Sequence, residues 1–148
     1  MLFHPILHVA HLLEEVLRTE LRALGIPPRQ ARILTAIGQS GPVSQAALAR
    51  AFAVSRPSMA VMVDRLAKDG LIAFETPPGR QRPQLRLSPR GQALLPGIAH
   101  AWARVDARLL AALGPEQAQA FSLAARHARD ALGGAAPHEI LAPEGPAR

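Results

Sequence analysis

Apolar residues recur along much of the chain at the spacing of an amphipathic helix, and Gly and Pro interrupt the pattern. From about Pro5 to Leu24 they recur every three or four residues, which predicts a first helix that ends at Gly25 and the prolines behind it. A second, shorter helix is predicted from about Pro28 to Gly38. The apolar stripes of these two helices consist of Ile6, Val9, Leu13, Leu17, Leu21 and Leu24, and of Ala31, Leu34, Ala36 and Ile37.

Two serines mark the starts of the next two helices. Ser44 and Ser55 stand where a hydroxyl oxygen can accept a hydrogen bond from a backbone N–H of the first helical turn. The helices that they open are predicted to reach about Phe52 and about Lys68–Asp69, with the turn 53–54 between them and Gly70 as the stop. Their buried faces are expected to be Ala47, Leu48, Ala51 and Phe52, and Met59, Met62, Val63 and Leu66.

Two short segments of strand character follow. Leu71–Thr76 and Gln84–Leu87 are expected to pair, and the breaker-rich segment Pro77–Pro83 forms the tip of the hairpin between them. Two short helices joined by a tight turn and followed by a hairpin describe a winged helix-turn-helix. In that motif the second helix can lie in the major groove of DNA while the wing reaches the adjacent minor groove.

The remaining pattern predicts two more helices and a tail. Ser88 caps a long helix that reaches about Leu113, and Pro96 should kink this helix or delay its regular start. A last helix begins at Gly114–Glu116, and residues 135–148, which have little periodicity and three prolines, are predicted to form a flexible tail. The apolar stripes are Leu94, Ile98, Trp102, Val105, Leu109 and Leu113 in the long helix, and Phe121, Ala125, Ala128 and Leu132 in the last.

The predicted fold class is therefore mainly α with a small β-hairpin wing: a winged helix-turn-helix plus long helices. A length of 148 residues fits one domain, expected to span residues 1–134.

The distribution of charge along the chain indicates which part of this architecture meets a partner. The chain has 17 basic and 11 acidic residues, and all but one of the basic residues are Arg. Residues 56–90 contain seven basic and three acidic residues, a net charge of +4, whereas residues 91–148 balance to zero. The basic excess thus lies in the candidate recognition helix and wing, which favours an anionic partner such as nucleic acid.

Several classes of protein are excluded or disfavoured. The absence of Cys excludes disulfides, thiolate metal sites and a thiol redox switch. No apolar run approaches the length of a membrane span, and the amino terminus lacks the basic start of a secretory signal, so the expected compartment is the cytoplasm. The sequence also has no nucleophile elbow, zinc-protease helix or phosphate-binding loop, so we expect no enzyme activity, cofactor or bound metal.

The order and spacing of six fragments resemble the MarR family of bacterial transcriptional regulators. The resemblance covers about residues 6–132 and is carried by Leu24–Pro27, Leu34–Ile37, Leu48–Arg56, Val63–Leu66, Asp69–Ile72 and Leu85–Gly91. It implies a homodimer with dimerisation helices at about 4–24, 88–113 and 115–132. A winged helix-turn-helix is implied at about 28–87, often with a small-molecule pocket between the two regions. The family's Asp-x-Arg element at the wing tip is missing, since Gly79–Gln81 stands in its place.

The candidate DNA-binding residues follow from this arrangement. The amino end of the helix at Ser44 and Gln45 can direct backbone N–H groups at phosphate. Arg56 and Arg65 can donate two hydrogen bonds to guanine or to phosphate, and Arg80 or Arg82 can enter a minor groove. The other candidates are Ser55 and Ser58 as polar contacts, Ala60 and Val61 as contacts to thymine methyl groups, and Arg86 and Arg90 as backbone anchors.

The candidate ligand residues are fewer. His4, His8 and His11 fall on one side of the first helix, where they can bind a divalent metal or make polar contacts at a dimer or ligand interface. Trp102 can line a ligand cavity or pack in the core. An effector, if one binds, is expected to be a small anionic or phenolic molecule.

The predicted function is that of a dimeric, sequence-specific regulator that binds double-stranded, pseudo-palindromic DNA, a repressor relieved by a small effector. Two alternatives remain at this point: a winged helix that binds an acidic protein partner, and a regulator that senses a metal through histidine.

Overall fold

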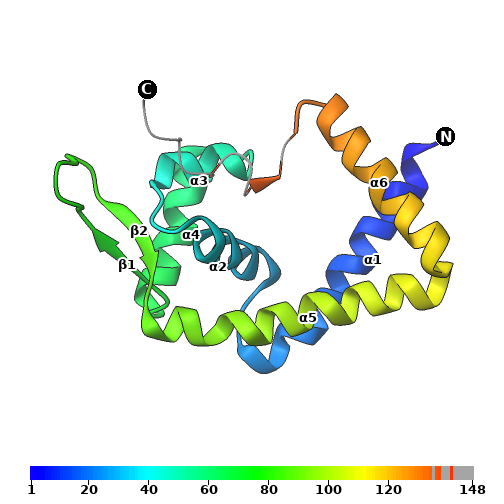
Figure 1. The fold of residues 1–148 in the computed structure, drawn as a ribbon, viewed down its shortest axis with the longest axis horizontal. Helices are drawn as coiled ribbons and strands as arrows, with labels where there is room; N and C mark the ends of the chain where they lie inside the picture. Colours follow the sequence, from blue (N-terminus) through cyan, green and yellow to red (C-terminus); the bar gives the residue numbers. More distant parts are fainter. Residues whose placement is uncertain (135, 138–140, 142–148) are drawn as a thin grey trace.

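The middle of the chain forms a winged helix-turn-helix lobe, and a long helix connects it to a second group of helices (Figure 1). The computed structural model describes residues 1–134, 136, 137 and 141. Around the lobe lie α1 (Phe3–Leu21), the short 3-10 helix η1 (Arg22–Leu24), α5 (Pro89–Leu113) and α6 (Pro115–Ala131). The lobe itself consists of α2 (Pro28–Ser40), α3 (Gln45–Ala51), α4 (Arg56–Lys68), β1 (Ile72–Glu75) and β2 (Gln84–Leu87).

These bounds confirm the predicted fold class and the order of its elements. The one difference in helix type lies at the end of the first predicted helix, where the α-helix stops at Leu21 and continues as η1. Gly25 then adopts a φ of 65°, a left-handed conformation that Gly reaches without steric cost, and this residue turns the chain into α2.

The wing is an antiparallel hairpin that a third segment extends. β1 pairs with β2 from Ile72 opposite Leu87 to Glu75 opposite Gln84. Val43, just before α3, forms an isolated bridge to Leu85, with N–O distances of 3.0 and 2.7 Å. This bridge ties the base of the wing to the start of α3, and the sequence pattern did not predict it.

The hydrophobic core lies in the lobe and where α1 and α5 cross it. The largest fully buried side chains come from six elements, and they are Leu21, Ile33, Leu34, Ile37, Leu48, Met59, Val63, Leu66, Leu85 and Ile98. All four residues of the predicted stripe of α2 are buried. In α4 the predicted stripe is buried except for Met62, which is half-buried against the core.

The start of α5 is fastened to the lobe. The Ser88 hydroxyl accepts a hydrogen bond from Gly91 N at 3.0 Å and donates one to the Gly70 carbonyl at 2.6 Å. Pro96 lies inside a helix that runs without a break from Pro89 to Leu113, so of the two effects predicted for Pro96, a kink or a delayed start, the delayed start does not occur. The Ser88 cap and Pro89, which is preorganised for a first turn, explain why the helix begins early.

The other end of the molecule is weakly buried. α6 has no buried residue, and Leu132, which the sequence places on its apolar face, is 87% exposed. Of the predicted stripe of α1, only Leu17 and Leu21 are buried. The large apolar side chains exposed on α1, α5 and α6 include Phe3, Ile6, Leu7, Leu12, Leu110, Phe121 and Leu123.

The predicted tail lies mainly outside the described residues. Of its described positions, Ala136 and Leu141 are both 6% exposed, and Leu141 belongs to the hydrophobic core.

Candidate nucleic-acid interface

Both helices of the helix-turn-helix begin at the serines that the sequence indicates. The Ser44 hydroxyl accepts a hydrogen bond from Ala47 N at 3.1 Å, and the Ser55 hydroxyl accepts one from Ser58 N at 3.2 Å. Ser55 also donates to the Ser58 hydroxyl at 2.8 Å. The two serines at the start of α4 therefore form a local polar pair whose remaining lone pairs face the exposed side of the lobe.

The outer face of α4 is open along its whole length. Met59, Val63 and Leu66 point into the core, and the opposite side exposes Arg56, Pro57, Ser58, Val61, Asp64, Arg65 and Lys68. Val61 is 70% exposed in the middle of this face. Ala60, which was predicted to share it, is only partly exposed and lies toward the flank of the helix. An exposed apolar side chain flanked by cations suits the mixed apolar and charged edges of DNA bases.

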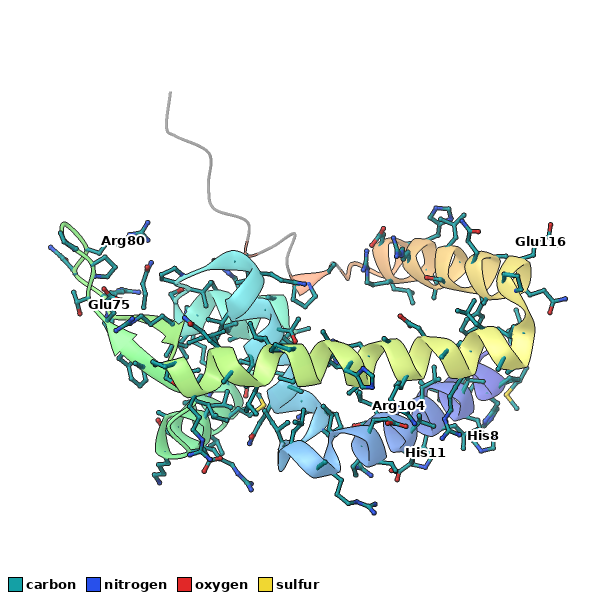
Figure 2. The ribbon with its side chains drawn as sticks, turned by 60° about the horizontal axis from the view of Figure 1, so that its bottom comes forward. His8, His11, Glu75, Arg80, Arg104 and Glu116 are labelled. Carbon is teal, nitrogen blue, oxygen red and sulfur yellow. The ribbon has the colours of Figure 1, made fainter. Side chains whose placement is uncertain are left out.

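The wing carries two exposed arginines. The turn at its tip is closed by a hydrogen bond from Arg80 N to the Pro77 carbonyl at 3.1 Å, and Gly79 has a φ of 80°. Arg80 lies at the tip of the wing (Figure 2) and is exposed. Arg82, on the returning side, is also exposed. The tip, where Gly79–Gln81 stands in place of an Asp-x-Arg element, is therefore held by a backbone turn.

Two arginines predicted to anchor the DNA backbone have intramolecular partners. Arg86 Nε lies 2.9 Å from Glu75 Oε2, across the two strands of the wing. Both side chains are about half exposed, so this pair braces the hairpin while it remains open to solvent. Arg90 donates to the Asp69 carbonyl at 2.9 Å, which ties α5 to the end of α4. Sequence reasoning missed Glu75, because a diagonal pair depends on the strand register.

Four predicted residues lie around one hollow between the wing and the helix-turn-helix. The hollow measures about 310 Å³ and is lined by Ser44, Gln45, Ala46, Arg56, Arg82 and Pro83. It thus combines the start of α3, the start of α4 and the descending side of the wing. Two guanidinium groups and the N–H groups at a helix start point to an anion such as a phosphate.

A second hollow, of about 200 Å³, surrounds the only tryptophan. It is lined by Arg32, Thr35, Ala36 and Gln39 of α2, together with Phe52, Trp102 and Pro137. The Arg32 guanidinium carbon lies 5.5 Å from the centre of the Phe52 ring, a cation–π arrangement. Trp102 is half-buried, so it both packs against the core and faces this hollow. Neither Arg32 nor Phe52 was predicted as a ligand residue, since only the tertiary fold brings them to Trp102.

The histidines lie elsewhere. His8 and His11 are exposed on α1, toward the end of the molecule opposite the wing (Figure 2), and neither lines the hollow around Trp102. His4 stacks on the Phe3 ring with centroids 4.6 Å apart. Among residues 1–134, 136, 137 and 141, no group of three His, Cys, Asp or Glu side chains is placed to hold a metal ion.

An apolar hollow of about 280 Å³ opens between α1, α5 and α6. Its lining is Val9, Leu12, Leu13, Arg108, Leu109, Ala112, Leu113 and Phe121.

Within the described part of the chain, no single helix is long and apolar enough to cross a membrane. Taken together, α3 and α4 are long and apolar enough to do so by length and composition alone, but a bend of 116° separates them.

Comparison with known proteins gives one family. The sequence model of the MarR family matches residues 24–83. No curated protein matches the chain.

Four solved structures, of three proteins, illustrate the similarity to known folds. The ligand-free organohalide-sensing transcriptional regulator RdhR superposes with a TM-score of 0.78 at 22% identity, covering 99% of this chain and 88% of its own. The Mycobacterium tuberculosis MarR family protein Rv2887, in complex with DNA, has a TM-score of 0.71 at 25% identity over 90% of this chain and 98% of its own. A probable transcriptional regulator from Pseudomonas aeruginosa has a TM-score of 0.67 at 30% identity, with 85% and 98% covered. Rv2887 has also been solved with salicylic acid, with a TM-score of 0.67 at 27% identity, covering 82% of this chain and 91% of that one.

Proposed function

The chain belongs to the MarR family of transcriptional regulators, and from this premise we propose that it is a homodimeric DNA-binding repressor released by a small effector. The observation that carries the proposal is the hollow where Arg56 and Arg82 meet the start of α3. We place the protein in the cytoplasm and assign it no catalytic activity.

In this proposal α4 and the wing contact different parts of the DNA. α4 enters the major groove with its exposed face, where Arg56 and Arg65 reach guanine edges or phosphates and Val61 meets a thymine methyl group. The phosphate between the two grooves occupies the hollow, held by Arg56, Arg82 and the backbone at Gln45. Arg80 then extends from the wing tip into the minor groove. Ser44, Ser55 and Ser58 are proposed as phosphate contacts next to their capping roles, and Arg86 as a contact at the base of the wing.

A second copy of the chain covers the apolar end of the molecule. α1, α5 and α6 meet at the end of the molecule away from the wing (Figure 1), and all three helices carry exposed apolar side chains. A contiguous apolar surface of this kind is costly in water and marks an interface. Pairing two copies there places the two recognition helices on half-sites about one helical turn of DNA apart. His8 and His11 lie on the same part of α1 and remain predicted contacts at this interface.

The effector site is the hollow around Trp102. Arg32 supplies the positive charge, Trp102 and Phe52 supply aromatic faces, and Thr35 and Gln39 supply polar groups. A compact anionic or phenolic molecule satisfies all three. The M. tuberculosis relative was solved with salicylic acid, which has this chemistry. Occupation of a hollow between α2 and α5 changes how the lobe sits on the dimer helices, and hence the spacing of the recognition helices.

Gel-shift binding to the DNA that flanks the protein's own gene tests this proposal. We expect a shift at low salt and a loss of affinity of about 1–3 kcal/mol for Arg56→Ala if the side chain reads a base edge. Arg18→Ala is the matched control, because Arg18 lies on α1 and pairs with Glu14 and Glu15. An absence of any shift at low salt contradicts the proposal and favours a winged helix that binds an acidic protein.

A further inference from the structure

The hollow around Trp102 has a wall that comes from the far end of the chain. Most of its lining belongs to α2, to Phe52 directly after α3 and to α5, but Pro137 follows α6. After α6 the chain leaves its helix with a φ of 81° at Gly133 and a hydrogen bond from Gly134 N to the Arg129 carbonyl at 2.9 Å. It then passes from the α6 end to the lobe, where the segment at residues 136–137 lies near α3 (Figure 1).

The residues on both sides of Pro137 are buried. Ala136 is 6% exposed, and Leu141 is 6% exposed and forms part of the hydrophobic core. Leu141 N also donates to the Pro137 carbonyl at 3.0 Å, which ties these two positions to each other. Burial of the Leu141 side chain favours docking of this segment, and the conformational entropy lost on ordering its backbone opposes docking.

We propose that Ala136, Pro137 and Leu141 dock as a C-terminal wall of the effector hollow, so that effector binding and docking of this wall stabilise each other. The inference rests on the proposed effector site and adds its regulation. A ligand held between Arg32 and Trp102 contacts Pro137 as well, because all three side chains line the same space of about 200 Å³. Thermodynamic linkage then requires that loss of docking weakens ligand binding by the same factor by which the ligand favours docking.

The wall also joins the two halves of the molecule. The chain already crosses between the lobe and the dimer helices at η1 and along α5, and the wall adds a third crossing that begins at α6. A ligand that favours docking therefore acts on the position of the lobe relative to α6. The physical consequence is that the effector signal reaches the dimer region through the end of the chain as well as through α5.

Trp102 provides a direct probe of docking. The chain contains one Trp and no Tyr, so its intrinsic fluorescence reports on the hollow alone. Leu141→Ala removes the buried side chain that anchors the wall, and it substitutes no residue that lines the hollow. In the ligand-free protein we expect a red-shifted emission and stronger quenching by acrylamide, because Trp102 loses the cover of Pro137. For salicylate, followed by titration calorimetry, we expect an affinity loss of about tenfold, within the usual range of coupling between sites.

Leu71→Ala is the matched control. It deletes the same atoms at a similarly buried position, 5% exposed. Leu71 contacts Gly91, which lies about 16 Å along α5 from Trp102. This variant should lose stability without a change in quenching or in salicylate affinity. Pro137→Ala, which keeps the Leu141 anchor and trims only the wall, should weaken salicylate binding without unfolding anything.

The outcomes are distinct. Unchanged Trp102 quenching in Leu141→Ala overturns docking of the wall. Increased quenching with unchanged salicylate affinity overturns the coupling, because the wall then has no effect on the ligand. Increased quenching with tighter salicylate binding also overturns it, because the wall then competes with the ligand for the hollow. If the wild-type protein binds no salicylate, the proposed effector chemistry fails, while the quenching comparison still decides whether the wall is docked.

Discussion

Gly91 in the first turn of α5 lies against the backbone of Leu71, just before β1, and Gly91→Ala tests whether that contact positions the lobe. A Cβ built on Gly91 would lie 2.0 Å from the carbonyl oxygen of Leu71 and 3.1 Å from its carbonyl carbon. The same Leu71 carbonyl oxygen already accepts a hydrogen bond from Ser88 N at 3.0 Å. No rotamer change relieves a clash with backbone, so the start of α5 and the backbone at Leu71 must move apart.

The cost follows from the bonds that this movement disturbs. Separation weakens the bond from Ser88 N to Leu71 and the bond from the Ser88 hydroxyl to Gly70, each worth about 1 kcal/mol. Overpacking itself costs about 1–3 kcal/mol, whereas the better helix propensity of Ala returns about 1 kcal/mol. The expected net loss in the free energy of unfolding is about 2 kcal/mol, and we also expect weaker DNA binding because the wing moves relative to α5.

Urea denaturation followed by circular dichroism measures the stability change. Gly97→Ala is the control: it makes the same substitution six residues further along α5, where the nearest atoms, at 2.9 Å, belong to the flexible Leu24 side chain. We expect Gly97→Ala to change stability little, since Leu24 can move and the helix gains propensity. A Gly91→Ala protein as stable as wild type would refute the reasoning.

Three further substitutions test other parts of the structure. Ala53 has a φ of 51°, a strained value for a residue with a Cβ, so Ala53→Gly should raise the free energy of unfolding by about 0.5–1 kcal/mol in urea titrations, and a loss would contradict the strain. Glu75→Gln releases Arg86 for phosphate and should strengthen DNA binding in fluorescence anisotropy, with a salt slope steeper by about 1; weaker binding would show instead that the pair positions Arg86. Leu12→Asp, at a 52% exposed apolar position beside the hollow of α1, α5 and α6, should give monomers in sedimentation velocity while the chain stays folded, and an intact dimer would contradict the proposed interface.

The parts of the fold that the sequence predicted depend on local chemistry. Ser44 and Ser55 cap their helices because a hydroxyl in that position satisfies a free N–H whatever surrounds it. Gly70, with a φ of 69°, begins the turn out of α4 for an equally local reason. The alternation of Gln84–Leu87 likewise matches its observed burial.

The parts that it did not predict depend on long-range pairing. The bridge from Val43 to Leu85 involves a single residue, too short to leave a periodic pattern. The Arg32–Phe52 contact and its closeness to Trp102 arise only when α2, α3 and α5 pack together. For α6 the pattern identified an apolar face, but periodicity does not reveal whether that face meets its own chain or a second copy.

The salt dependence of DNA binding tests the central claim most directly. Fluorescence anisotropy with DNA flanking the protein's own gene, between 50 and 200 mM salt as a convenient range, gives the slope of log Kd against log salt for wild type, Arg56→Ala, Arg82→Ala and the control Arg18→Ala. If the hollow between wing and helix-turn-helix holds a phosphate, each of the first two substitutions should lower the slope by about 1 and the control should leave it unchanged. Slopes that do not differ among the four proteins, or no binding at the lowest salt, would contradict this interface.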